Sequence, residues 1–286
     1  MKKILLTGST SFLGSKFIEL YNGRFDILGI ARSDYLYPID LLDFNAVKKV
    51  YEDFQPDIVI HCAADVGIDP STSSTIVQTN SATTKNLAEL AISHSTPFIF
   101  TSTESVYGGK EQTGGYKEND PYKPRNLYGE SKVVCENILI ASGLPYLITR
   151  AHRNVGINKG YNKPKQFPDA VKALGQNQEI HVDSHRLFMP CLINNICEVF
   201  THYIDKDLDK KLILNLGVDK ATTYYDFLRD VAKTLGLNQK LIKPDGEESA
   251  WPPNGTLSTE KMKRLGYPVL TYNHLLQTLK KDWQAQ

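Results

Sequence analysis

The sequence predicts an α/β protein in which a Rossmann-like, doubly wound parallel sheet is followed by a smaller carboxy-terminal α/β region. Through the first half of the chain, short apolar segments rich in β-branched residues alternate with segments whose apolar residues recur at helical spacing. A glycine turn, "LLTGSTSFLGS" (Leu5–Ser15), follows the first apolar segment and opens the first helical one. This strand–turn–helix order is typical of loops that hold the diphosphate of a dinucleotide.

The first elements follow this alternation in order. Ile4–Leu6 is predicted to be a strand, and a helix is expected from about Leu13 to Tyr21. A second strand is predicted at Phe25–Ala31, and the helical spacing of Phe44–Phe54 predicts a second helix. The apolar segment Pro56–Ala64 is predicted to be a strand that is buried on both faces, as parallel strands are.

The same alternation continues to residue 150. We expect a helix over 79–94, a strand over 97–103, a helix over 128–142 and a strand over 145–150. The polar segment 108–126, rich in glycine and lysine, is too long for a simple connection. It is therefore a candidate rim of an active site.

Beyond residue 150 the alternation loosens. Helices are predicted within 185–204 and 222–237, with the short strand "LILNLG" between them and two small surface helices near the carboxyl end. We therefore expect residues 1–150 to form a dinucleotide-binding domain. Residues 151–286 are expected to be mainly a substrate-binding region packed over the carboxyl edge of the sheet, where open α/β sheets bind ligands.

Composition narrows the class of protein. Of the 286 residues, 41% are hydrophobic and 23% charged, which is typical of a soluble globular protein. The net charge of +1 gives no electrostatic reason to expect a nucleic-acid or membrane partner. The four cysteines have no CxxC spacing, and the apolar segments are too short for a leader or a membrane span. We therefore expect a cytoplasmic protein.

The glycine loop departs from the usual pattern at one position. Gly8 and Gly14 bracket the turn, but Ser11 stands where such loops usually have a glycine. Serine adds only a small hydroxymethyl group, which can itself donate to a phosphate oxygen. We expect the loop to bind a cofactor through Gly8, Ser11, Phe12, Leu13 and Gly14. The alternative is a degenerate site in a protein that has lost its cofactor.

A tyrosine and a lysine form the candidate catalytic pair. Tyr128 and Lys132 in "LYGESK" are four residues apart on a predicted helix and therefore share one face. A nearby ammonium favours the phenolate, so we expect the pKa of Tyr128 to lie below its usual value of about 10. Such a pair suits proton transfer in a carbonyl–alcohol interconversion. Thr103, which ends the strand "FIFTST", offers a hydroxyl for the same oxygen; the alternative for the pair is a solvated helix face.

These features, in this order, resemble the extended short-chain dehydrogenase/reductase family, and within it the dTDP-4-dehydrorhamnose reductase-like branch. The resemblance covers essentially the whole chain. "TGSTSFLG" resembles the family's TGxxGxxG, and "STESVYGG" resembles its STDYVFDG segment. "YKENDPYKPRNLYGESK" matches E-x-D-x-P-x-P…YGxxK, which is the most specific match. "TNSATTKNL" resembles the helix that carries the family's active-site asparagine.

The resemblance implies roles for four residues. Tyr128 would give a proton to the substrate's carbonyl oxygen as a nicotinamide gives hydride, and Lys132 would tune Tyr128 and hold the nicotinamide ribose. Thr103 would orient the carbonyl, and Asn80 would support the proton relay. The resemblance also implies cofactor contacts from the backbones of Ala63, Ala64 and Ala151, from Asp40 and Leu41 near the adenine, and dimerisation through helices of the cofactor domain.

The end of the second predicted strand bears on the choice of cofactor. A carboxylate there would bind the adenosine ribose hydroxyls, whereas Arg32 can meet a 2′-phosphate. This favours NADP(H), although Arg32 as an ordinary surface charge is the alternative. Asp34 nearby keeps NAD(H) open.

Further departures from the branch concern the substrate. Arg153 stands where the rhamnose reductases have an aromatic residue over the sugar, and Trp251 stands where they commonly have an arginine near the nucleotide diphosphate. Arg153 is either a cation in the sugar pocket or a surface charge, and Trp251 either stacks on a base or is buried by packing. With Thr103, Glu104 and Tyr128, these two are the candidate substrate-binding residues.

Histidines give no signal for a metal. His181 and His185 in "HVDSH" have no companion ligands at a recognisable spacing, so no metal site is predicted. His61 and His152 come at the ends of predicted strands and are expected to line the pocket rather than to catalyse.

Three functions remain open. The leading one is an NAD(P)H-dependent reductase of a nucleotide-linked 4-keto-6-deoxy sugar, serving polysaccharide biosynthesis. The second is a nucleotide-sugar epimerase or dehydratase of the same family, which Glu104 after Thr103 also suits. The third is a non-catalytic regulatory subunit, which a decayed loop at Ser11 would suit. The presence of Thr103, Tyr128 and Lys132 together favours an enzyme.

Overall fold

Within the described residues, six parallel strands form one sheet in the order β10-β5-β4-β3-β1-β2. The computed structural model describes residues 1–32, 37–67, 73–109, 114–158, 161, 163, 165–245 and 253–285. The strands of the sheet are β1 (Lys3–Thr7), β2 (Asp26–Ile30), β3 (Ile58–His61), β4 (Phe98–Thr103), β5 (Tyr146–Ala151) and β10 (Lys211–Asn215).

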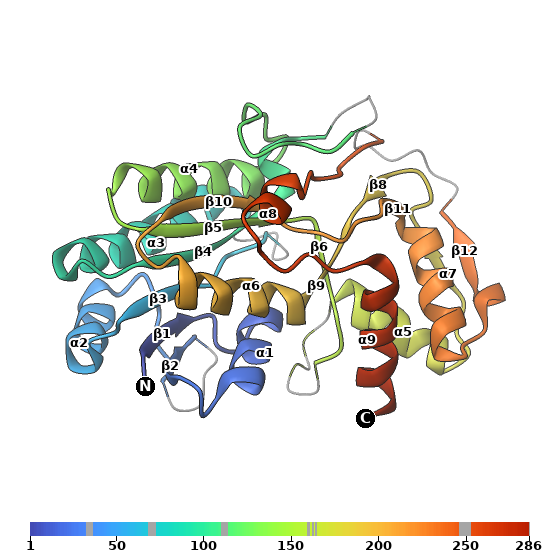
Figure 1. The fold of residues 1–286 in the computed structure, drawn as a ribbon, viewed down its shortest axis with the longest axis horizontal. Coiled ribbons are helices and arrows are strands. Elements are labelled where there is room, and N and C mark those ends of the chain that lie inside the picture. Colours follow the sequence, from blue (N-terminus) through green and yellow to red (C-terminus); the bar gives the residue numbers. More distant parts are fainter. Residues whose placement is uncertain are drawn as a thin grey trace.

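Alternate residues of the strands face two helical layers. Ile4 and Leu6 of β1 are buried in a cluster with α1 (Phe12–Tyr21) and α6 (Ile193–Lys206). Leu5, between them, is buried in a second cluster on the opposite face. That face is covered by α2 (Phe44–Phe54), α3 (Ile76–His94) and α4 (Leu127–Ala141). Figure 1 shows the sheet between these layers, and the predicted doubly wound α/β fold is confirmed.

The strand order predicts where on the sheet a ligand would bind. β1 lies between β2 and β3, so the chain leaves β1 in one direction and later returns to its other side. Such a reversal of strand order opens a crevice at the carboxyl ends of the strands. The segment that begins with Gly8 follows β1 directly into this crevice.

The second half of the chain builds a separate hydrophobic core. It is formed by α5 (Gln166–Gly175), α7 (Tyr224–Leu235) and α9 (Tyr272–Gln284), which lie together at one end of the molecule (Figure 1). The second half also contains three short strand pairs: β6 (Arg153–Val155) with β9 (Pro190–Leu192), β7 (Ile180–Val182) with β12 (Ile242–Pro244), and β8 (Leu187–Phe188) with β11 (Thr222–Thr223). The remaining elements are α8 (Glu260–Arg264) and three 3₁₀ turns at Ser73–Thr75, Glu104–Val106 and Gln239–Leu241.

Two expectations about this half need correction. The division at residue 150 does not separate the sheet from the rest, because β10 pairs with β5 and α6 packs against α1. The helix near the carboxyl end is not a small surface helix, because α9 buries one face in the second core. An amphipathic pattern alone does not tell how much of a helix is covered.

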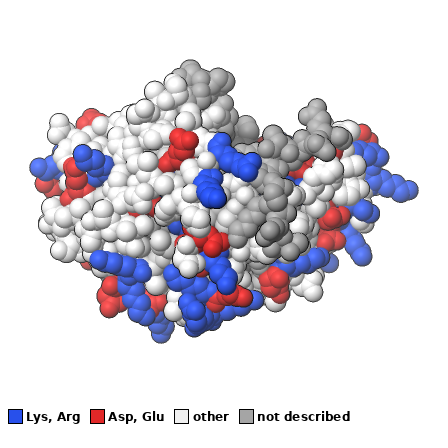
Figure 2. All heavy atoms as spheres, turned by 90° about the horizontal axis from the view of Figure 1, so that it is seen from above, with Lys and Arg blue, Asp and Glu red and all other residues white. Residues whose placement is uncertain are grey.

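The charged surface shows mixed signs. On the face drawn in Figure 2, lysine and arginine side chains are interspersed with aspartate and glutamate side chains. Among the described helices, none combines the length and the apolar character that a membrane span requires.

Candidate active site

Glycine is required at two positions of the turn after β1. Gly8 has φ +71°, and a Cβ there would lie 2.7 Å from the backbone nitrogen of Ala63. A Cβ on Gly14 would lie 2.2 Å from the carbonyl oxygen of Gly8. The turn, the start of α1 and the segment after β3 are therefore packed backbone against backbone.

Ser11 is the N-cap of α1. Its hydroxyl oxygen accepts a hydrogen bond of 3.0 Å from the backbone N–H of Gly14, and its own backbone is extended, with φ −75°. The position therefore does not require the conformational freedom of glycine. The serine satisfies one of the amide groups that a helix start leaves unpaired, and its hydroxyl retains the capacity to donate one hydrogen bond.

An asparagine from the second half of the chain holds this loop in place. The side-chain amide of Asn158 donates to the carbonyl oxygen of Phe12 and to the hydroxyl of Ser15, both at 2.9 Å. Phe12 and Leu13 are buried in the first turn of α1. No motif in the sequence marks Asn158, because its partners lie more than 140 positions away.

The residues expected near the adenosine lie at the edge of the crevice. Arg32 is exposed just beyond β2, whose last carbonyl, that of Ile30, accepts a 2.8 Å hydrogen bond from the N–H of Gly8. Asp40 is exposed, and its carboxylate accepts from the N–H of Leu42. Leu41 is buried. Asp34 lies outside the described residues.

The structure brings the predicted catalytic residues together. Thr103 ends β4, and Tyr128 and Lys132 share one face of α4, with the Lys132 ammonium 5.7 Å from the centre of the Tyr128 ring. Lys132 is 2% exposed, and its Nζ donates to the carbonyl oxygen of Thr101 at 2.8 Å. Its ammonium also lies 4.5 Å from the centre of the Phe100 ring. The pair is thus not a solvated helix face.

The expected lowering of the tyrosine pKa is wrong for this structure. Burial raises the pKa of Tyr128 above its usual value, and the nearby Glu104 raises it further. Burial also lowers the pKa of Lys132. The physical reason is that burial penalises the charged phenolate and that the carboxyl group of Glu104 repels it. Tyr128 is therefore a neutral phenol, which can give a proton.

Asn80 is linked to Tyr128 through the side chain of Ser131. Its side-chain amide donates to the carbonyl oxygen of Asp65 and to the hydroxyl of Ser131, and its own oxygen accepts from the N–H of Asp65. Ser131 in turn donates to the backbone carbonyl of Tyr128 at 2.7 Å. These contacts tie the segment after β3 to the first turn of α4, so the observed contacts of Asn80 are positioning ones.

Thr103 is hydrogen-bonded to a buried carboxyl group. Its hydroxyl donates to Glu104 at 2.8 Å. Burial raises the pKa of Glu104, and the guanidinium of Arg186, 3.6 Å away, opposes that rise. Nε2 of His152 lies 3.4 Å from the same carboxyl. A carboxyl group of raised pKa beside the threonine can serve as its proton acceptor or donor.

A cavity of about 360 Å³ opens beside these groups. Tyr128 and Thr103 line it, as do Ala151 at the end of β5 and Arg153 at the start of β6. Arg153 therefore lines the pocket and is not merely a surface charge. Its guanidinium lies 4.3 Å from the centre of the Tyr224 ring. Of the residues predicted to contact a cofactor, Ala63 packs against Gly8 and Ala64 is exposed. The substrate-binding candidate Trp251 lies outside the described residues.

A family model covers nearly the whole of this architecture. The model described as the RmlD substrate binding domain matches residues 1–284. The chain belongs to this family. The predicted dTDP-4-dehydrorhamnose reductase-like branch of the extended short-chain dehydrogenase/reductases is thereby confirmed, and with it the general class of oxidoreductase-type enzymes.

Relatives of this RmlD-family chain are named after two different kinds of protein, a reductase and a subunit of an adenosyltransferase. A dTDP-4-dehydrorhamnose reductase of Aggregatibacter actinomycetemcomitans is 27% identical over 236 residues, which cover 79% of this chain and 77% of the relative. A methionine adenosyltransferase 2 subunit beta of Danio rerio is 26% identical over 291 residues, covering 94% and 86%.

Solved structures match the fold over its full length. A dTDP-4-dehydrorhamnose reductase of Bacillus anthracis, solved in complex with NADP, has a TM-score of 0.86 at 19% identity and covers 100% of both chains. A UDP-glucose 4-epimerase of Thermotoga maritima, solved with UDP-glucose, has a TM-score of 0.86 at 18% identity and covers 99% of both.

A buried ion pair that the sequence reasoning missed links β5 to α4 in this RmlD-family chain. Arg150 of β5 is 1% exposed and forms a two-bond ion pair with Glu136 of α4, at 3.0 and 2.6 Å. It also donates to the hydroxyls of Tyr107 and Tyr122. The network therefore joins α4 to the sheet and to the segment that precedes α4. A charged residue inside the apolar strand "LITR" is the signal that could have found it.

The remaining histidines of this RmlD-family chain have structural settings. His61 is buried between the hydroxyls of Thr7 and Thr84, and burial lowers its pKa to about 3. His181 is exposed beside Glu179. Over the parts of the chain that the structure describes, no three histidine, cysteine, aspartate or glutamate side chains gather as a metal site would require.

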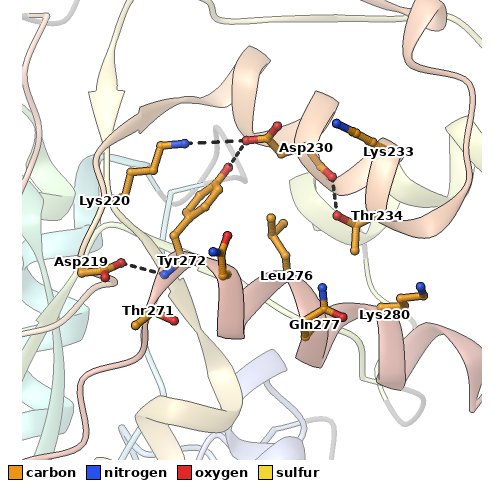
Figure 3. A pocket seen from close by; sticks show the side chains of 11 residues that line it. Asp219, Lys220, Asp230, Lys233, Thr234, Thr271, Tyr272, Leu276, Gln277 and Lys280 are labelled. Atoms are coloured by element: carbon orange, nitrogen blue, oxygen red, sulfur yellow. Dashed lines mark hydrogen bonds and ion pairs between the residues drawn. The ribbon is translucent and has the colours of Figure 1, made fainter.

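A second cavity, of about 720 Å³, lies between α7 and α9 of the RmlD-family fold. Figure 3 shows one pair of opposite charges in it: Lys220 lies 4.0 Å from Asp230, which also accepts from the hydroxyl of Tyr272 at 2.9 Å. None of the predicted catalytic or cofactor residues lines it. The smaller cavity at Tyr128 is the candidate active site.

Proposed function

We propose that the protein is an NAD(P)H-dependent reductase of a nucleotide-linked 4-keto-6-deoxy sugar. The observation that carries the proposal is the meeting of a neutral phenol, Tyr128, and a strand-end hydroxyl, Thr103, in one cavity at the carboxyl edge of a doubly wound sheet. The relatives named as dTDP-4-dehydrorhamnose reductases support the substrate class.

The glycine loop fits a nicotinamide dinucleotide. At Gly8 and Gly14 the backbone of the turn packs directly against other backbone atoms, which leaves no room for a Cβ. The start of a helix after such a turn suits the binding of a diphosphate. The exposed Arg32 at the end of β2 favours a 2′-phosphate and hence NADP(H), while NAD(H) remains the alternative. When bound, the reduced nicotinamide supplies the hydride.

In this proposal Tyr128 acts as the proton donor. Reduction of a ketone leaves negative charge on the former carbonyl oxygen, and a neutral phenol within hydrogen-bond reach gives that oxygen a proton. The raised pKa of Tyr128 keeps the phenol protonated through neutral pH. Lys132 uses one of its three N–H bonds on the Thr101 carbonyl, which leaves two for a ribose hydroxyl and for the resulting phenolate.

Thr103 and Glu104 orient the reacting carbonyl. The single hydroxyl hydrogen of Thr103 is given to Glu104 here. If Glu104 carries the proton, which its raised pKa favours, it donates to Thr103 and releases that hydrogen toward the substrate oxygen. The carboxyl group is thus a switch for the direction of the threonine's hydrogen bond.

The test is reduction by the purified full-length chain. NADPH or NADH is supplied with dTDP-, GDP-, CDP- and UDP-linked 4-keto-6-deoxy sugars, and the loss of cofactor absorbance is followed. We expect stoichiometric oxidation of NADPH with at least one of them and an alcohol at C4 by NMR. No oxidation of either cofactor with any member would overturn the proposal. Turnover without net loss of cofactor would instead identify an epimerase or dehydratase.

A regulatory subunit is the second candidate. It is favoured by the similarity to methionine adenosyltransferase 2 subunit beta over 94% of this chain. Thr103 and Tyr128 line one cavity, and Lys132 lies beside the ring of Tyr128, which speaks for catalysis. Stable co-purification with a larger enzyme, together with no ketone reduction, would decide for the second candidate.

A further inference from the structure

The two carboxyl oxygens of Glu104 face different groups. Oε2 accepts the 2.8 Å hydrogen bond from the hydroxyl of Thr103, which lines the catalytic cavity. Oε1 accepts from the hydroxyl of Ser105 at 3.2 Å and lies 3.6 Å from Nη2 of Arg186 and 3.4 Å from Nε2 of His152. Glu104 therefore connects a hydroxyl at the cavity to a guanidinium that is not among the residues lining it.

Arg186 is the cation with the largest effect on Glu104. Burial raises the pKa of Glu104, and Arg186 opposes that rise more than Arg153 does. The guanidinium of Arg153 instead donates to the amide oxygen of Gln166 at 2.8 Å. His152 adds no charge, because burial, Arg186 and Arg153 hold its pKa well below its usual value. An arginine keeps its charge in proteins, so the effect of Arg186 is permanent.

Close backbone packing fixes the place of Arg186. The N–H of Leu187, the next residue, donates to the carbonyl oxygen of Pro253 at 2.7 Å, and the N–H of Gly255 donates to the carbonyl oxygen of Leu187 at 2.9 Å. A Cβ on Gly255 would lie 2.7 Å from Nη2 of Arg186. The guanidinium is therefore packed directly against the backbone of the segment 253–255, and its side chain is only 10% exposed.

A structural brace is the alternative explanation for the contact between Arg186 and Glu104. The Arg150–Glu136 pair has that geometry, with hydrogen bonds of 3.0 and 2.6 Å. Arg186 approaches Glu104 only to 3.6 Å, which is longer than a hydrogen bond. Burial lowers the pKa of Arg186 although Glu104 and Asp183 oppose that change. Such a loose contact braces little, but a full charge at this distance still changes the pKa of a carboxyl group by about one unit or more.

We propose that Arg186 is a positioning residue for the reaction, which acts through Glu104 and decides whether Thr103 donates its hydrogen to Glu104 or to the substrate's carbonyl oxygen. The inference rests on the proposed reductase function. When Glu104 is ionised, Thr103 donates to Oε2, as the structure has it. When Oε2 carries a proton, it donates to Thr103, whose own hydrogen then serves the carbonyl oxygen. A nearby cation favours the ionised carboxyl group, so Arg186 sets the pH above which Thr103 no longer donates to the substrate.

Other titrating groups of the site can be separated from Glu104. Burial and Glu104 raise the pKa of Tyr128, so the phenol keeps its proton near neutral pH. Burial lowers the pKa of Lys132, and loss of that charge would also reduce activity at alkaline pH. Glu104→Gln distinguishes the two causes. Its amide donates to Thr103 as a protonated carboxyl group does, but it does not titrate.

The test follows ketone reduction against pH with the full-length chain, at saturating cofactor and with the sugar that the cofactor-oxidation assay identifies. Arg186→Gln and Arg186→Met both remove the charge, and Arg186→Lys keeps it. Glu104→Gln is measured alone and combined with Arg186→Gln. Arg24→Met is the matched control, because Arg24 forms an exposed ion pair with Asp205 at 2.7 Å.

We expect kcat of the unmodified chain to fall on the alkaline side as Glu104 loses its proton. Both neutral variants of Arg186 should move that fall to higher pH by about one unit or more, and Arg186→Lys should move it less. Glu104→Gln should lack this fall, and adding Arg186→Gln to it should then have no further effect on the pH profile. Arg24→Met should match the unmodified chain. A fall at the same pH in the neutral variants of Arg186, or one that persists in Glu104→Gln, would overturn the inference.

A second measurement needs no substrate. Infrared difference spectra of the folded chain record the ionisation of the Glu104 carboxyl group, which is assigned by its disappearance in Glu104→Gln. The midpoint should rise in the neutral variants of Arg186. If ketones are reduced but neither the midpoint nor the alkaline fall responds to Arg186, only this inference fails. If the midpoint responds and no ketone is reduced, the coupling of Arg186 to Glu104 stands and the reductase function fails.

Discussion

Tyr128 shows that a motif names a residue but not its protonation state. The spacing of Tyr128 and Lys132 predicted their shared face, and the structure has it. The predicted pKa was wrong because the sequence does not show how deeply the phenol is enclosed or that Glu104 lies near it. The neutral phenol suits reduction, in which the group must start with its proton.

Replacing the phenol tests its role directly. Tyr128→Phe keeps the ring and removes the proton donor, so ketone reduction should fall by about 100-fold or more. Cofactor affinity should change little, and the two are measured by steady-state kinetics and by fluorescence titration of NADPH. Reduction at an undiminished rate in the phenylalanine variant would remove Tyr128 from the mechanism.

His61 predicts an acid-sensitive stability. Its pKa in the folded chain is about 3, below the ordinary value of 6.5, because the ring is buried between two threonine hydroxyls. The unfolded chain therefore binds the proton more readily, and stability is lost as pH falls from about 6.5 toward 3.

The test measures how steeply the free energy of unfolding falls as the pH is lowered. The free energy of urea unfolding is followed between neutral and acidic pH for the unmodified chain and for His61→Gln. The glutamine variant should lose less stability over the same interval, with part of the slope left because His152 is also buried and neutral. An unchanged slope would mean that His61 does not control it.

At the scale of elements, the first turn of α1 depends on a serine cap. Ser11→Ala removes the hydrogen bond to the Gly14 N–H and should lower the free energy of unfolding by about 1 kcal/mol. Ser11→Gly should cost only a few tenths, because glycine is a fair cap. Urea unfolding of the three proteins measures this, and equal stabilities would contradict the capping role.

Helix α4 is fixed to the sheet by the Arg150–Glu136 pair. Removing one member leaves a buried charge, so Arg150→Met should cost about 3–5 kcal/mol of unfolding free energy. The double variant with Glu136→Leu should recover a large part of that loss. A double variant as unstable as the sum of both single ones would show that the two charges are not coupled.

The sequence predicted the long elements of the first half better than the short strands of the second half. The strands and helices of the first half have clear periods, so their predicted positions agree with β1 to β5 and α1 to α4. Strands of two or three residues such as β8 and β11 have no period to detect. Asn158 belongs to no motif, and its importance depends on contacts made by folding.

For the whole molecule, the sheet needs both halves of the chain. β10 completes its edge at β5, and α6 covers the face that presents Ile4 and Leu6. The fragment 1–150 should therefore expose a broad apolar surface and lack a cooperative unfolding transition. Near-ultraviolet circular dichroism and dye binding measure this against the full chain. Cooperative unfolding of the fragment would instead support a domain boundary at residue 150.

The two hydrogen bonds of Asn158 have a consequence for the glycine motif. Its side-chain amide comes from the second half of the chain and holds the carbonyl oxygen of Phe12 and the hydroxyl of Ser15. The motif is therefore not self-contained, because the first turn of its helix takes part of its support from a residue more than 140 positions away.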